Sequence, residues 1–124
     1  MNSGVQVRRI YDAALPTDGY RVLVDRLWPR GLAKEKAHYD EWCRDAAPSA
    51  ELRNWYAHDP EKLSEFQERY LAELSDGEHV EALDSLREKV ASGLTLLTAT
   101  KDLALSQAQV LADYLNQSTS STQG

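Results

Sequence analysis

The stretch Tyr20-Arg21-Val22-Leu23-Val24-Asp25 decides the fold class. Its Val-Leu-Val centre is continuously apolar, which is typical of a strand covered on both faces, as in a parallel sheet. A second stretch of this kind, Leu94-Thr95-Leu96-Leu97-Thr98-Ala99, lies near the other end of the chain. Both stretches are therefore predicted to be buried strands.

Helices are predicted between and after these strands. Ser49 is a good N-cap for a helix over 50–57, and Asp59-Pro60 is a typical helix start. Apolar residues three or four positions apart predict a helix over 60–75 that stops near Gly77, and another that ends before Gly93. Ser106 with Gln109 forms a capping-box pattern for a last helix.

Weaker patterns complete the element order. A strand is expected over 5–10, a short helix over 32–39 and a short strand over 40–44. The direction of the first strand stays open, because about ten residues are few for a helical crossover. Interleaved strands and helices predict an α/β fold with a small, mostly parallel sheet covered by helices.

The length of 124 residues suits one domain. We expect this domain to span residues 1–117 and the low-complexity stretch 118–124 to be disordered. A single cysteine, Cys43, excludes a disulfide framework and a Cys-rich zinc site, and it is expected to be buried. No secretory signal and no apolar run of about 18 residues is present, so we expect a cytoplasmic protein without a membrane anchor.

The charge is unevenly distributed along the chain. Residues 1–53 hold nine Lys and Arg against eight Asp and Glu, a net charge of +1, whereas residues 54–124 hold five against twelve, a net charge of −7. Nucleic-acid binding requires a broad basic face, so a nucleic-acid partner is not expected. A focused site for an anion is compatible with this distribution.

Charged residues follow both predicted buried strands. Because ligands bind beyond the carboxyl ends of the strands in open α/β sheets, parallel strands would bring the two charged clusters together. Arginine side chains there would hold a phosphate or carboxylate, a tryptophan would cover it, and a carboxylate would act as a general base. The predicted ligand-binding residues are Arg26, Trp28, Arg30, Gly31 and Lys101, and the predicted catalytic residues are Asp25 and Asp102.

A structural interpretation of the same residues stays open. Arg26 could pair with Asp25 or Asp102 as a lock, and Trp28 could simply pack under a helix. His38, His58 and His79 are not at metal-ligand spacing, so no metal site is expected. No Gly-rich phosphate loop is present, and no cofactor is expected.

Several of these stretches together carry a family resemblance. They are Tyr20 to Gly31 (YRVLVDRLWPRG), Lys34 to Ala37, Trp42, Asp45 to Ser49, Leu52 to Trp55, His58 to Pro60, Phe66 to Tyr70 and Leu96 to Asp102. The chain closely resembles the YeaO-like family of short bacterial proteins, whose function is not known. The resemblance implies an α/β fold and a cytoplasmic bacterial protein, and it implies no established activity.

Two functional hypotheses follow. The first is an enzyme or a small-molecule-binding protein that acts on an anionic ligand at the carboxyl edge of the sheet. The alternative is an interaction or regulatory module that uses the aromatic-rich segment 42–55 as a partner surface. The sequence leaves open whether the protein is an enzyme, and it does not determine the oligomeric state.

Overall fold

The computed structural model describes residues 5–121 and confirms the α/β class, with one small parallel sheet. Within these residues the strands are β1 (Val5–Arg9), β2 (Tyr20–Leu23), β3 (Glu41–Trp42) and β4 (Leu94–Thr98). They lie in the order β1-β4-β2-β3, and every neighbouring pair is parallel. The first strand, whose direction the sequence left open, therefore runs parallel to the others.

β4 lies in the centre of the sheet, between β1 and β2. Leu96 is opposite Val7 on one side and Val22 on the other, and all five residues of β4 are buried. This environment explains the continuous apolar runs of β2 and β4, since both faces of a central parallel strand are covered. It also places the carboxyl ends of β2 and β4 side by side.

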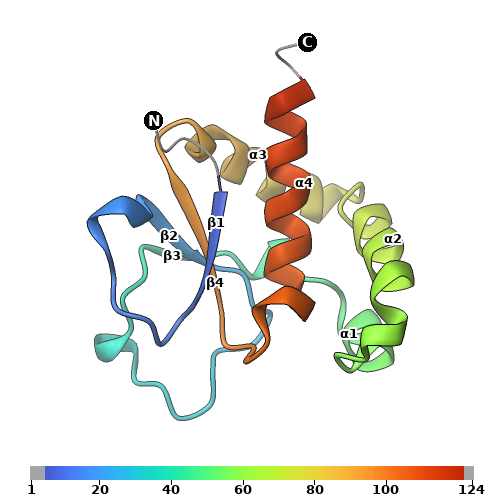
Figure 1. Ribbon diagram of the computed structural model, residues 1–124, viewed down its shortest axis with the longest axis horizontal. Coiled ribbons are helices and arrows are strands. Elements are labelled where there is room, and N and C mark those ends of the chain that lie inside the picture. Colours follow the sequence, from blue (N-terminus) through green and yellow to red (C-terminus); the bar gives the residue numbers. More distant parts are fainter. Residues whose placement is uncertain (1–4, 122–124) are drawn as a thin grey trace.

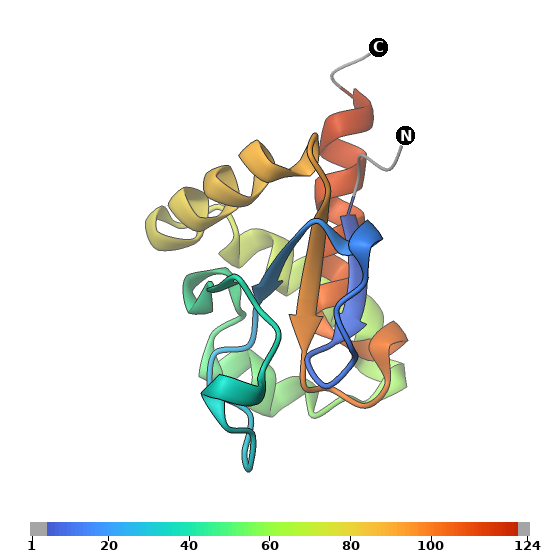
Figure 2. The same ribbon diagram turned by 90° about the vertical axis from the view of Figure 1, so that its left-hand side faces the viewer.

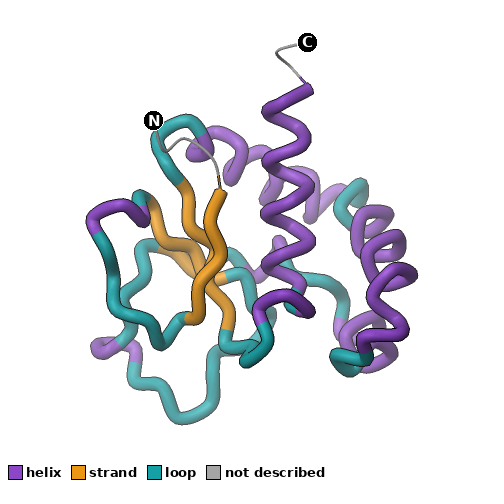
Figure 3. The backbone as a smooth tube through the Cα atoms, in the orientation of Figure 1, coloured by secondary structure: helices purple, strands orange, loops and turns teal. Residues whose placement is uncertain are grey.

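Helices cover one face of the sheet. They are α1 (Ala50–Tyr56), α2 (Leu63–Glu73), α3 (Gly77–Val90) and α4 (Gln107–Ser121). Figure 1 shows the sheet on the left of the molecule and the helices on the right, and Figure 3 shows the same arrangement by element type. Val22 and Leu96 point to this side and pack in one core with Phe66, Tyr70 and Leu111.

An irregular connection, residues 24–40, covers the opposite face. Leu23 and Leu97 pack there against the rings of Trp28, Tyr39 and Trp42. Figure 2 looks onto this side, with the connection and the loop between β1 and β2 in front of the strands. The prediction of a short helix over 32–39 is wrong, because the structure has a single 3-10 turn there, Lys34–Lys36. The apolar side chains of the segment are used to cover the sheet and do not form a helical stripe.

The loop between β1 and β2 is held by buried polar contacts. Arg21 donates to the carboxylate of Asp18, and both side chains are almost fully buried. The Thr95 hydroxyl donates to the Asp18 carbonyl at 2.6 Å. Gly19 has φ +67°, and a Cβ there would lie 2.4 Å from the carbonyl oxygen of Gly93. Only glycine fits this close approach of two backbone segments.

The helix starts follow the sequence signals closely. The Ser49 side chain accepts from the Leu52 N–H, Asp59 caps the 3-10 turn that leads into α2, and Ser106 accepts from the Gln109 N–H at 3.2 Å. Gly77 was expected to end a helix, and this expectation is wrong, because Gly77 is the first residue of α3.

The carboxyl end of the chain lies partly outside the described residues. α4 continues to Ser121 and so includes the first residues of the stretch 118–124 for which we expected disorder. Residues 122–124 are outside the described part, and a domain boundary at residue 117 stays a prediction. Among the described residues, no helix is long and apolar enough to cross a membrane, and no three His, Cys, Asp or Glu side chains form a metal-binding group.

Candidate functional site

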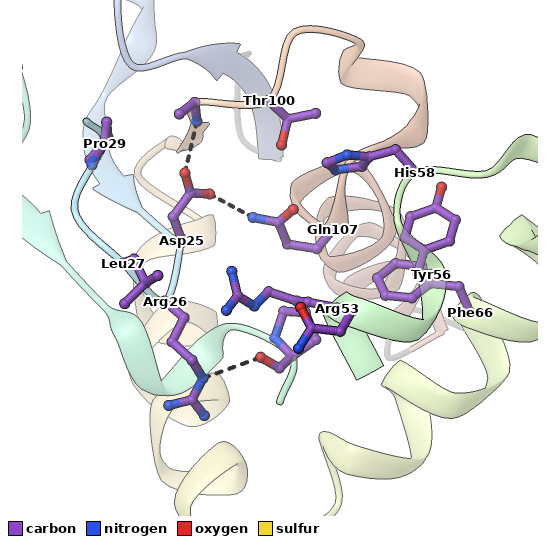
Figure 4. Close-up of a pocket in the computed structure, with 13 residues that line it drawn as sticks. Asp25, Arg26, Leu27, Pro29, Arg53, Tyr56, His58, Phe66, Thr100 and Gln107 are labelled. Atoms are coloured by element: carbon purple, nitrogen blue, oxygen red, sulfur yellow. Dashed lines mark hydrogen bonds between the residues drawn. The ribbon is translucent and has the colours of Figure 1, made fainter. Parts of the chain in front are cut away.

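A hollow of about 370 Å³ opens at the carboxyl ends of β2 and β4. Its walls are formed by the segments that follow the two strands, by α1 and the residues on either side of it, and by single residues of α2 and α4 (Figure 4). Its lining residues are Asp25, Arg26, Leu27, Pro29, Pro48, Arg53, Asn54, Tyr56, His58, Phe66, Ala99, Thr100 and Gln107. This position is where open α/β sheets bind ligands.

Asp25 is held by three hydrogen-bond donors. Its Oδ1 accepts from the Thr98 hydroxyl at 2.7 Å and from the Gln107 side chain at 2.6 Å, and its Oδ2 accepts from the Ala99 N–H at 2.9 Å. The Asp25 carbonyl oxygen also accepts from the Trp42 indole at 2.8 Å. Asp25 thus ties the end of β2 to β4, to α4 and to β3.

Two arginines line the hollow without a carboxylate partner. Among residues 5–121, no carboxylate forms an ion pair with Arg26 or Arg53. Arg26 donates weakly from Nε to the Pro48 carbonyl at 3.4 Å, and the Nε of Arg53 is buried with no hydrogen-bond partner in the described part of the chain. Figure 4 shows the Arg53 side chain reaching across the hollow toward Asp25. Asp25 is the only acid among the described residues of the lining, so the two arginines give these residues a net charge of +1.

His58 reaches the hollow through a strained turn. Ala57 and His58 have φ angles of +46° and +57°, and they are the non-glycine residues with positive φ in the described chain. The turn is fixed because Ala57 donates to the Arg53 carbonyl at 3.0 Å and Asp59 donates to the Tyr56 carbonyl at 2.9 Å. Consecutive left-handed residues are uncommon and cluster at functional sites. Here they turn an exposed imidazole onto the wall of the hollow.

Tyr56 forms the wall beside His58. Its ring contacts the His58 ring edge to face at 5.7 Å, and its hydroxyl donates to the Leu105 carbonyl at 2.8 Å. Burial raises the pKa of Tyr56. The hydroxyl therefore stays protonated at neutral pH and serves to dock α1 against the segment before α4.

The other residues predicted from the sequence lie outside the hollow. Trp28 packs edge to face against Tyr39 and Trp42 and donates to the Leu32 carbonyl at 2.6 Å. The remaining four, Arg30, Gly31, Lys101 and Asp102, are exposed. Asp102 caps a 3-10 turn by accepting from the Ala104 N–H at 3.2 Å. The structure thus brings Asp25 and Arg26 together and places the others elsewhere, and whether any of them binds or reacts stays a prediction.

The aromatic residues of segment 42–55 do not form one surface. Trp42 belongs to the cluster on the face covered by the connection, whereas Trp55 packs against the core on the helical face. Arg44 lies over the Trp42 ring, and Arg69 lies over the Trp55 ring. Between the two tryptophans, Cys43 is buried, and burial raises its pKa to about 11.

Sequence reasoning missed Arg53, His58 and Gln107 as residues of one site. Arg53 and His58 stand in stretches that carry the family resemblance, and Gln107 directly follows the predicted N-cap Ser106. The position of Gln107 at the start of the last helix, soon after the second buried strand, was a signal that could have been used, whereas the docking of α1 has no local signature.

Comparisons with known proteins agree on one family. Residues 4–124 match the family model described as the inactive DUF488-N3 subclade. An uncharacterised protein of Mycobacterium tuberculosis is 47% identical over 112 residues, covering 90% of this chain and 93% of the relative. The uncharacterised protein YeaO of Escherichia coli is 43% identical over 112 residues, covering 90% of this chain and 96% of the relative. No solved structure matches the chain. The chain belongs to the DUF488-N3 subclade and is a relative of YeaO, as the resemblance indicated.

Proposed function

We propose that this protein binds a small anionic ligand, carrying a phosphate or a carboxylate, in the hollow at the carboxyl edge of the sheet, without transforming it. The observation that carries the proposal is the pair of guanidinium groups, Arg26 and Arg53, on a lining whose carboxylate, Asp25, already accepts three hydrogen bonds. Arginine presents a planar fork of donors that matches phosphate and carboxylate oxygens.

Binding without catalysis is supported by the state of Asp25. A general base must offer a free lone pair within reach of the proton that it removes. Asp25 accepts three protein hydrogen bonds, two on Oδ1 and one on Oδ2, so only one of its about four lone-pair sites is left for a substrate proton. The description of the subclade as inactive supports the same proposal. A catalytic role for Asp25 or Asp102 is the competing hypothesis.

The test measures stabilisation by inorganic phosphate in thermal unfolding at constant ionic strength. A ligand that binds only the folded state stabilises the protein and so raises its melting temperature. At a ligand concentration 100 times the Kd, the free energy of unfolding increases by about 2.7 kcal/mol. We expect phosphate to raise the melting temperature of the wild-type protein and of Arg30→Gln, whose exposed arginine lies outside the hollow. Arg26→Gln and Arg53→Gln should lose this rise.

The outcomes separate the possible locations of the site. If Arg30→Gln loses the phosphate effect and Arg53→Gln keeps it, the anion binds on the outer loop that holds Trp28, and the proposal is wrong. An equal rise in all variants would indicate nonspecific salt effects and would also contradict it. Phosphate esters recovered unchanged after incubation, measured by ³¹P NMR, are expected for a protein that only binds.

A further inference from the structure

The lining of the hollow carries hydrogen-bond donors and acceptors on different elements. Arg26, Arg53 and Asn54 come from the segment after β2 and from α1, and they supply hydrogen-bond donors. The Nε of Arg53 is buried and has no hydrogen-bond partner among the described residues, so the terminal nitrogens of its guanidinium group are the donors available to a ligand in the hollow.

Gln107, the first residue of α4, presents an acceptor. Its Nε2 donates to Asp25 at 2.6 Å and lies 3.4 Å from the Thr98 hydroxyl and 3.5 Å from the Val24 carbonyl. Since these neighbours include a carboxylate and a carbonyl, the amide nitrogen and not the oxygen must face them. The Oε1 of Gln107 is therefore directed away from Asp25, on the side of Thr100 and His58 (Figure 4).

The Thr100 hydroxyl supplies a second acceptor beside it. Thr98 has one hydroxyl hydrogen, and its short contact of 2.7 Å with the Asp25 carboxylate is the stronger use of that hydrogen. The hydroxyls of Thr98 and Thr100 lie 3.1 Å apart, so Thr100 supplies the hydrogen in that arrangement. The Thr100 oxygen then keeps its lone pairs for a ligand.

From these donors and acceptors, and resting on the proposed function, we infer that the ligand is a hydroxyl-bearing phosphate monoester of the pentose phosphate type. The phosphate binds Arg26 and Arg53, and hydroxyl groups donate to Gln107 Oε1 and Thr100 Oγ1. The volume of about 370 Å³ lies within the range of roughly 300–1,000 Å³ of small-molecule sites, so a free phosphate ion would leave most of it empty. A free sugar phosphate and the sugar phosphate of a nucleotide share this chemistry.

The test compares ligands by isothermal titration calorimetry on the full-length protein. Ribose 5-phosphate is compared with propyl phosphate, a monoester that carries no hydroxyl group. We expect ribose 5-phosphate to bind at least tenfold more tightly. Thr100→Val should reduce this ratio severalfold, and Thr100→Ser, which keeps a hydroxyl, should restore it. Thr17→Val, an exposed site far from the hollow in the loop before β2, is the matched control and should keep the full ratio.

The possible results separate this inference from the proposed function. If both esters bind equally well, or if Thr100→Val keeps the full ratio, the inferred ligand class is wrong and anion binding survives. If neither ester binds and phosphate gives no stabilisation, the proposed function itself is wrong. Tighter binding of AMP than of ribose 5-phosphate would identify a nucleotide as the source of the ligand, and weaker binding would identify a free sugar phosphate.

Discussion

Replacing Asp25 by asparagine tests whether this carboxylate is a structural tie or a free catalytic group. The two side chains have nearly the same shape, so a base that waits for substrate would tolerate the change with little loss of stability. Asp25 instead accepts from Thr98, Gln107 and the Ala99 N–H. We therefore expect Asp25→Asn to destabilise the fold markedly.

The magnitude follows from the three contacts. The amide oxygen of an asparagine could still accept from Thr98 and Gln107, but its NH₂ group would face the Ala99 N–H. That N–H would lose its acceptor, which costs about 1–3 kcal/mol. The two remaining bonds would lose their charge assistance, about 1 kcal/mol more. The expected loss is about 2–4 kcal/mol, or on the order of 10 °C in melting temperature for a domain of this size.

The assay is urea unfolding followed by circular dichroism and tryptophan fluorescence, with the m-value checked for two-state behaviour. Asp102→Asn is the matched control, because Asp102 caps a 3-10 turn through one N–H and asparagine caps helices equally well. The control should stay within about 0.5 kcal/mol of the wild type. A loss below about 0.5 kcal/mol for Asp25→Asn would refute the structural role and reopen catalysis by this residue.

Two further predictions concern glycine and cysteine. Gly19→Ala should destabilise the protein by about 2–5 kcal/mol in urea unfolding, because its positive φ costs about 1–2 kcal/mol and the overlap of its Cβ with a backbone carbonyl costs about 1–3 kcal/mol more. Gly31→Ala has a similar positive φ but open space around it, so it should lose only about 1–2 kcal/mol. Equal losses would contradict the close approach at Gly19. Burial raises the pKa of Cys43 from 9.0 to about 11, so the stability that its neutral thiol contributes is present below pH 9 and is lost as the pH rises toward 11. The unfolding free energy of the wild type should therefore fall more steeply over pH 9–11 than that of Cys43→Ala, and parallel curves would contradict burial of the thiol.

The sheet was predictable from the sequence because its signals are local. The apolar centre of β2 and the stretch that forms β4 need cover on both faces, and this requirement holds wherever the helices dock. The caps Ser49, Asp59 and Ser106 were predictable for the same reason, since each side chain bonds a backbone N–H two or three residues away. The prediction that a helix ends at Gly77 was wrong because a glycine at a helix boundary can stand at either end of a helix.

The candidate site was only half predictable because it depends on contacts between distant segments. Asp25 and Arg26 follow directly from the strand that carries them, but Arg53 reaches the hollow only through the docking of α1. Trp28 was expected to cover a ligand, and it covers the sheet instead, packed against Tyr39 and Trp42. The residues next to a tryptophan in the sequence do not indicate whether its ring will pack against a ligand or against the face of a sheet.

The charge of the hollow depends on how Asp25 is used by the fold. A carboxylate at the end of β2 would by itself weaken any anion site, because it lies on the same lining as Arg26 and Arg53. Its hydrogen bonds run to Thr98, Ala99 and Gln107, so three of its about four lone-pair sites are directed toward the end of β4 and toward α4. The same bonds orient the Gln107 amide and thereby present its Oε1 as an acceptor. One hydrogen-bonded tie between strand and helix thus both leaves the arginines available for an anion and orients the acceptor that would select its hydroxyl groups.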